Sequence, residues 1–233
     1  MAPQQNNRSL TARPLLCLVS DRSRIARAAG SDGRAELVDL VRNAGRVGVD
    51  LIQVRERDLS ARDLYELVRT CVQATLHSAT RLIVNDRLDV ALAAGAAGIH
   101  LRSDSPGASR VRQVVPDGFL IGRSVHGSDE AVAAAKEGEV DYLIAGTIFP
   151  TASKSAMHHY LGLEGLRAVV QRVDVPVLAI GGVTMSAIGA IAACGAAGVA
   201  AIRLFADAGP DADELARFGQ KARSEFDTSG RVS

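Results

Sequence analysis

The feature that most constrains this chain is the alternation of short apolar runs with longer stretches of helix-forming residues. The runs are rich in Leu, Ile and Val, as expected for parallel strands buried on both faces. They cover Leu15–Ser20, Leu51–Arg55, Arg81–Asn85, Gly98–Leu101, Leu120–Val125, Tyr142–Gly146, Pro176–Ile180 and Gly198–Ile202. The stretches that follow them predict helices over 34–47, 60–78, 87–95, 107–115, 128–138, 162–172, 184–194 and 211–225. Eight strand–helix units predict an α/β fold, a single (β/α)8 TIM barrel.

Four glycines support this repeated construction. Gly45, Gly95, Gly138 and Gly195 are each predicted to end a helix with a positive φ, shortly before a strand. An open, doubly wound sheet is the alternative, but it would usually have fewer strands at this length, and no GxGxxG follows the first strand. We expect a frayed N-terminus over 1–13, the barrel over 14–226 and a C-terminal tail over 227–233.

Composition excludes several function classes. The 233 residues include 27 Lys and Arg against 26 Asp and Glu, a balance that argues against binding nucleic acid or an anionic membrane. The three cysteines form no CxxC pair, and no secretory signal or membrane-spanning apolar run is present. We therefore expect a cytoplasmic protein that acts on a small molecule. The sequence leaves a homo-oligomer open.

Polar residues collect after the predicted strands, where barrel enzymes carry their chemistry. Gln53, Arg55 and Arg57 alternate along one strand end, so their side chains are expected to converge on the barrel mouth. Two guanidinium groups and an amide suit a phosphate or a diphosphate. The alternative is a salt-bridged strand end with Glu56 and Asp58 as the partners.

The next strand ends carry further candidates. Asn85 and Asp86 suit a hydrated Mg²⁺ and a substrate phosphate, or else the N-cap of the helix from Arg87. His126 has a side chain able to move a proton near neutral pH, although it could simply cap a turn. His100 lies within its strand and is expected to be a hydrogen-bonded residue of the barrel wall.

Two glycines mark a second anion site. Gly181 and Gly182 follow the seventh strand and are predicted to open a helix, whose N-terminal amides would suit a phosphate. On the eighth strand, Ile202 and Arg203 would complete this site. Arg203 either adds positive charge there or pairs with Asp207.

Taken together, these segments resemble the family of thiamine-phosphate synthase and its TenI-like relatives. The resemblance runs from about Leu16 to Ala206. The matching segments are QVRER (53–57), VNDRLDVALAAGAAGIHL (84–101), IGRSVH (121–126), DYLIAGTIFPTASK (141–154), LGLEGL (161–166), PVLAIGGV (176–183) and GAAGVAAI (195–202). The resemblance implies a TIM barrel that acts in thiamine biosynthesis.

The same resemblance implies roles for individual residues. The pyrimidine and diphosphate positions are Gln53, Arg55, Arg57, Asn85, Ser124 and Lys154, with Arg57 standing where the family has Lys. The thiazole-phosphate positions are Thr151, Ser153, Gly181, Gly182, Ile202 and Arg203. A Mg²⁺ ion would be held by Asp86 and, in the synthase, by a second Asp.

That second Asp is missing. The synthase pattern is His-Leu-Gly-Gln-x-Asp, whereas residues 100–105 read His-Leu-Arg-Ser-Asp-Ser, which places Ser105 at the Asp position. Asp104 comes one residue early and would serve only if the loop shifts. A lost carboxylate weakens a Mg²⁺ site that relies on one or two of them.

We therefore favour the TenI-like activity, thiazole tautomerase, in which His126 would shuttle a proton on a carboxythiazole phosphate without a metal. The segments 55–57, 122–126 and 161–164 resemble that branch. The alternative is a thiamine-phosphate synthase that uses Mg²⁺ to join hydroxymethylpyrimidine diphosphate to thiazole phosphate. A third alternative is a non-catalytic regulator that binds such a phosphate, since relatives often carry Ser where this chain has Arg203.

Overall fold

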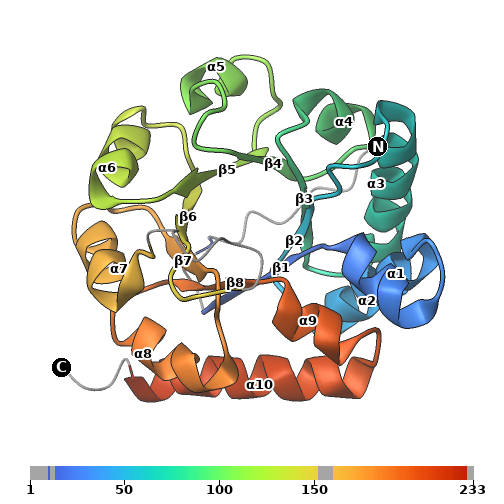
Figure 1. Ribbon diagram of the computed structural model, residues 1–233. Coiled ribbons are helices and arrows are strands. Elements are labelled where there is room, and N and C mark those ends of the chain that lie inside the picture. The colour runs from blue at the N-terminus through green and yellow to red at the C-terminus, as the bar shows by residue number, and fades with distance from the viewer. Residues whose placement is uncertain (1–9, 11–13, 152–159, 230–233) are drawn as a thin grey trace.

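The computed structural model describes residue 10 and residues 14–151 and 160–229, which form a closed barrel of eight parallel strands ringed by helices (Figure 1). Each strand pairs with the next along the chain, and β8 pairs with β1. The strands are β1 (Leu15–Val19), β2 (Leu51–Val54), β3 (Arg81–Asn85), β4 (Gly98–Leu101), β5 (Leu120–Val125), β6 (Tyr142–Gly146), β7 (Val177–Ile180) and β8 (Gly198–Ala201). The predicted fold class is confirmed.

The helices cover the outside of the barrel. They are α1 (Arg22–Ala29), α2 (Arg34–Arg46), α3 (Ala61–Thr75), α4 (Leu88–Ala93), α5 (Ala108–Arg112), α6 (Ser128–Lys136), α7 (Gly162–Val170), α8 (Ile188–Ala192), α9 (Arg203–Ala208) and α10 (Ala212–Ser229). A 3₁₀ turn over Met185–Ala187 precedes α8. The longest helix, α10, runs beneath α8 and α9 in Figure 1.

Several boundaries differ from the sequence predictions. Helices α1 and α9 were not expected, and the helix predicted over 184–194 is a 3₁₀ turn followed by the short α8. Helix α10 continues to Ser229, past the expected end of the barrel at residue 226. The prediction for Gly45 is wrong: it lies inside α2, and Gly48 adopts the positive φ instead. Residues 1–9, 11–13 and 230–233 lie outside the described chain.

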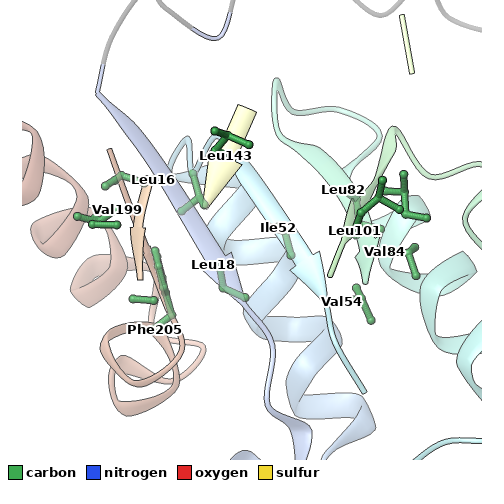
Figure 2. Close-up of a cluster of buried hydrophobic side chains, with 14 of the residues drawn as sticks. Leu16, Leu18, Ile52, Val54, Leu82, Val84, Leu101, Leu143, Val199 and Phe205 are labelled. Atoms are coloured by element: carbon green, nitrogen blue, oxygen red, sulfur yellow. The ribbon is translucent and has the colours of Figure 1, made fainter. Parts of the chain in front are cut away.

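Two apolar layers hold the barrel together. Alternate strand residues, such as Leu16 and Leu18, point outward and pack against the helices (Figure 2). The residues between them, such as Cys17, point inward and form a separate cluster made of strand side chains. Within the described residues, no helix is long and apolar enough to cross a membrane.

The side chains that point into the barrel change from apolar to polar along the strands. Near the start of the strands they are apolar, with Leu15, Leu51 and Leu120 buried. Towards the strand ends they become polar, with Gln53 and His100 buried at 3% and 2% exposure. The strand phase therefore sends polar side chains to one end of the barrel interior.

Candidate active site

A cavity of about 530 Å³ opens at the carboxyl ends of the strands. This size is within the usual range for a small-molecule site. Its strand-end residues include Gln53, Arg55, Arg57, Asn85, His100, Arg102, Ser124, His126, Ile180, Ala200, Ile202 and Arg203. Side chains from strands and loops far apart in sequence thus meet at one place, as the barrel prediction required.

The β2 end presents two guanidinium groups to this cavity. Arg55 and Arg57 both line it, and neither guanidinium forms an ion pair or a hydrogen bond with the rest of the described chain. Gln53 lies beneath them and donates from Nε2 to Oδ1 of Asn85 at 3.1 Å. The alternative of a salt-bridged strand end is wrong, because Glu56 and Asp58 interact with another residue, Arg22.

A buried hydrogen-bond network around Glu56 holds this strand end in place. The buried Glu56 carboxylate accepts hydrogen bonds from the Ser20 hydroxyl and from the backbone N–H of Arg22, at 3.1 Å to each oxygen. Ser20 in turn accepts from the backbone N–H of Arg55 at 2.9 Å. Burial raises the pKa of Glu56, and these hydrogen bonds oppose that rise. The network ties the β1–α1 turn to the segment that carries the two arginines.

Burial lowers the pKa of Arg55, and the charges of Arg57 and Arg102 act in the same direction. The charges of Asp21 and Glu56 act in the opposite direction but do not cancel the lowering. Buried cations are normally paired, because desolvation without a partner is costly. An anionic ligand would supply the missing partner.

The acidic residues after β3 and β4, predicted as metal ligands, contact neighbouring side chains instead. Asp86 has a φ of 60°, and its carboxylate accepts from the Ser105 hydroxyl and lies 3.7 Å from the guanidinium of Arg102. Asp104 pairs with the same guanidinium. The N-cap alternative for Asp86 is wrong, since Arg87 occupies that position and no side chain caps the helix.

These residues do not fit a Mg²⁺ site. Arg102 lines the cavity, whereas neither Asp86 nor Asp104 does. The shift that Asp104 would need is opposed by Arg123, which donates to three carbonyl oxygens of the 103–106 loop. No cluster of three or more His, Cys, Asp or Glu suited to a metal occurs in the described ranges. The prediction of Asp86 and Asp104 as metal ligands is therefore not supported by the donor set, and a guanidinium faces the cavity instead.

Two histidines contribute to the β4–β5 side. His100 is buried between Tyr142 and Ser124, as expected for a hydrogen-bonded wall residue. His126 lies at the cavity edge, where Glu130 contacts its Nδ1 at 3.2 Å and accepts from its backbone N–H at 2.9 Å. An acceptor at Nδ1 leaves the Nε2 of a neutral imidazole as a base. The pair has the arrangement of an oriented proton acceptor.

The opposite rim is built from backbone. Gly181 and Gly182 have φ values of 97° and 64°, and a Cβ on Gly182 would lie 2.6 Å from the carbonyl oxygens of Phe149 and Pro150. Thr151 also lines this rim. The helix expected after these glycines begins as a 3₁₀ turn at Met185, with Thr184 as its N-cap at the cavity, and becomes α-helical at Ile188. Glycine therefore serves close backbone approach here.

Arginines complete the ring of charge. Arg203 lines the cavity and lies 4.0 Å from the Asp207 carboxylate, a long and exposed contact. Arg24, on the unexpected helix α1, lines the cavity too and lies 3.8 Å from the same carboxylate. Arg24 was not among the predicted site residues, although its position just after the first strand was a usable signal. Ser153 and Lys154 lie outside the described residues.

The fold and the cavity together define a class: a (β/α)8 barrel protein with an arginine-rich cavity at the strand ends. The match to a family model narrows the class. The model described as thiamine monophosphate synthase matches residues 16–205. The chain belongs to this family, and it is an enzyme of thiamine biosynthesis.

Individual relatives agree with this assignment. The chain is 42% identical to a thiamine-phosphate synthase of Methanoculleus marisnigri over 70% of this chain and 77% of the relative. It is 36% identical to a thiamine-phosphate synthase of Roseiflexus castenholzii over 89% and 87% of the two chains. Among solved structures, it is similar to a thiamine phosphate pyrophosphorylase from Pyrococcus furiosus, with a TM-score of 0.78, 30% identity, and coverage of 95% of this chain and 100% of the other.

Proposed function

We propose that this protein is a thiamine-phosphate synthase, which joins hydroxymethylpyrimidine diphosphate to a thiazole phosphate and releases diphosphate. The observation that carries the proposal is that one cavity has two anion-accepting rims. One rim holds Arg55 and Arg57, and the other holds Gly181 and Gly182. The reaction brings together two substrates that each carry phosphate, whereas a tautomerase acts on one.

The arginine rim suits the diphosphate. In the reaction, the bond between the pyrimidine methylene carbon and the diphosphate oxygen breaks, and the diphosphate leaves with the electron pair. The lone pair of the thiazole nitrogen forms the new C–N bond. Negative charge grows on the leaving group, where fixed guanidinium groups stabilise it in a partly dehydrated site. Arg55, Arg57 and Arg102 are placed for this role, with Gln53 and Asn85 beneath them.

The glycine rim suits the thiazole phosphate. Gly181 and Gly182 bring bare backbone to the cavity, and Thr151, Ile202 and Arg203 lie beside them. The arginine rim follows β2 and the glycine rim follows β7, and in the closed barrel β8 and β1 separate these strands on one side and β3–β6 on the other, so the two rims occupy different parts of the mouth. This placement lets two substrates meet between the rims.

The names of the relatives support the synthase over the tautomerase that the sequence motifs favoured. The family resemblance also implies Mg²⁺. Because the carboxylates of Asp86 and Asp104 are directed to Arg102, we assign no step to a metal.

One observation favours thiazole tautomerase as a second candidate function. His126 lies at the cavity edge with Glu130 at its Nδ1, an arrangement suited to moving a proton on a bound carboxythiazole phosphate. The synthase needs no such base, since its leaving group departs without a proton transfer from carbon. His126→Ala therefore separates the two candidates.

The deciding experiment incubates the purified protein with thiazole phosphate, hydroxymethylpyrimidine diphosphate and Mg²⁺, and measures thiamine phosphate by chromatography. We expect product from the wild type, a loss of at least about tenfold in Arg57→Ala, and wild-type turnover in Arg62→Ala. Arg62 is an exposed arginine outside the cavity and is the matched control.

The other outcomes are equally informative. No thiamine phosphate, together with aromatisation of a carboxythiazole phosphate that His126→Ala abolishes, would replace the synthase with the tautomerase. Binding of thiazole phosphate without turnover in either assay would leave a non-catalytic binding protein. A His126→Ala variant with full synthase turnover agrees with the proposal.

A further inference from the structure

A chain of three polar side chains runs through the barrel interior to the cavity. His100 on β4 links Tyr142 on β6 to Ser124 on β5: its Nδ1 lies 3.2 Å from the Tyr142 hydroxyl, and its Nε2 lies 2.9 Å from Ser124 Oγ. His100 and Tyr142 are 2% and 0% exposed, while Ser124 lines the cavity. The chain thus connects the sealed interior with the site.

A glycine on β5 makes room for the Tyr142 ring beside His100. In the pairing register, Gly122 of β5 lies between His100 and Tyr142. A Cβ on Gly122 would lie 2.0 Å from Cζ of the tyrosine ring, so only glycine leaves room for the phenol. The two rings are then 5.7 Å apart at an interplanar angle of 28°. Backbone and side chains cooperate to hold the tyrosine against the histidine.

The charge states of His100 and Tyr142 follow from their burial. Burial lowers the pKa of His100 to about 3, and the charge of Arg55 acts in the same direction. Burial also raises the pKa of Tyr142 well above its ordinary value. The histidine is therefore neutral and the phenol protonated at physiological pH. A neutral imidazole has one N–H donor and one acceptor nitrogen.

The available donors and acceptors then fix which group donates in each of the two hydrogen bonds. A buried hydroxyl must donate its hydrogen to avoid the cost of an unsatisfied group. Within the described part of the chain, the Tyr142 hydroxyl has only His100 Nδ1 as a hydrogen-bond partner. The hydroxyl therefore donates to Nδ1, and the imidazole hydrogen lies on Nε2. Nε2–H then donates to Ser124 Oγ.

We propose that His100 is a positioning residue: Tyr142 holds it as the Nε2–H tautomer, and this makes the Ser124 hydroxyl a donor towards an anion in the cavity. Because Oγ already accepts from the imidazole, its own hydrogen is directed away from the histidine. Phosphate oxygens accept hydrogen bonds, so such a hydroxyl favours them. The proposal deepens the proposed function, because it rests on Ser124 contacting the diphosphate.

The tautomer is tested directly by NMR of protein labelled with ¹⁵N at histidine. We expect neutral His100 with its hydrogen on Nε2 near pH 7 in the wild type. In Tyr142→Phe, which keeps the ring and removes the hydroxyl, we expect the other tautomer to become populated. An Nδ1–H tautomer or an imidazolium in the wild type would overturn the proposal. This readout needs no ligand and does not depend on the proposed function.

The consequence for binding is tested by calorimetry with inorganic diphosphate. We expect Tyr142→Phe to weaken binding by about three- to tenfold, the effect of one hydrogen bond. In a Ser124→Ala background the same change should add almost nothing, whereas a general packing defect would weaken binding in both backgrounds. Tyr65→Phe, on a tyrosine packed outside the barrel, is the matched control and should bind normally.

The outcomes separate the two proposals. If Ser124→Ala binds diphosphate as the wild type does while His100 remains the Nε2–H tautomer, the assignment of Ser124 to the diphosphate fails. If Ser124→Ala weakens binding but Tyr142→Phe changes neither tautomer nor affinity, the positioning role of His100 is wrong and the anion site stands.

Discussion

In the proposed site, the two rims of the cavity would accept anions by different physical means. At the β2 rim, recognition depends on side-chain charge, because Arg55 and Arg57 face the cavity without partners in the described chain. At the β7 rim it depends on backbone shape, because Gly181 and Gly182 leave no room for a Cβ. The first rim should therefore be sensitive to loss of charge, and the second to any added atom.

The largest effect is expected at the glycine rim. Gly182→Ala places a Cβ against the carbonyl oxygens of Phe149 and Pro150, which cannot move as a side chain could. We expect affinity for thiazole phosphate, measured by calorimetry, to fall by about a hundredfold, which corresponds to about 3 kcal/mol. Gly138→Ala is the control, since its φ of 74° carries a similar backbone cost but its Cβ meets nothing within 4 Å. Equal binding by both variants would contradict the shape argument.

The next effect is expected at the arginine rim. Arg55→Met removes a charge-assisted contact, so affinity for diphosphate should fall by about ten- to hundredfold. The melting temperature should stay level or rise, because the variant removes a partly desolvated, unpaired cation. The exposed Arg62→Met is the control for both measurements. A marked drop in melting temperature for Arg55→Met would indicate that the cation is paired within the protein.

The support behind the arginine rim gives a pH-dependent prediction. The folded state raises the pKa of Glu56 above its ordinary value of 4.5, so the folded protein holds this proton more tightly than the unfolded chain. Stability from this group is therefore present below 4.5 and falls as pH rises through the folded pKa. Denaturant unfolding should show the free energy of the wild type falling relative to Glu56→Gln across that window.

Two further results complete this test. At neutral pH, the free energy of unfolding of Glu56→Gln should still be lower than that of the wild type by about 1–3 kcal/mol. The reason is that its amide nitrogen would face the Ser20 and Arg22 donors, which now donate to the carboxylate. Glu66→Gln, at an exposed residue paired with Arg69, should show neither effect. A parallel pH profile for the wild type and Glu56→Gln would exclude Glu56 as the titrating group.

The smallest effect is expected at the acidic loop beside the arginine rim. Asp104 is exposed, pairs with Arg102 and does not line the cavity. Asp104→Asn should therefore change turnover, at any concentration of added Mg²⁺, by less than about twofold, as is usual for exposed ion pairs. The exposed Asp89→Asn is the control. A tenfold loss of turnover for Asp104→Asn alone, recovered at higher Mg²⁺, would show that the loop does shift to bring this carboxylate to a metal.

Much of the fold could be predicted from local pattern. The apolar runs give the strands to within a residue at each end, because buried parallel strands leave a continuous signal in the sequence. The period of two also places Gln53 and Arg55 at the mouth. Helices α1 and α9 were missed because they are short and follow their strands almost directly.

By itself, the sequence determined the number of strands, their phase and hence which residues face the barrel interior, since these depend on local periodicity. Only the tertiary structure decided which charges pair. Glu56 finds its partners in Ser20 and Arg22 on another strand end, and Arg55 forms no ion pair within the described residues. Likewise, Asp86 and Asp104 hold Arg102 towards the cavity. Such pairing depends on where loops from different strands meet, and barrel closure sets those distances.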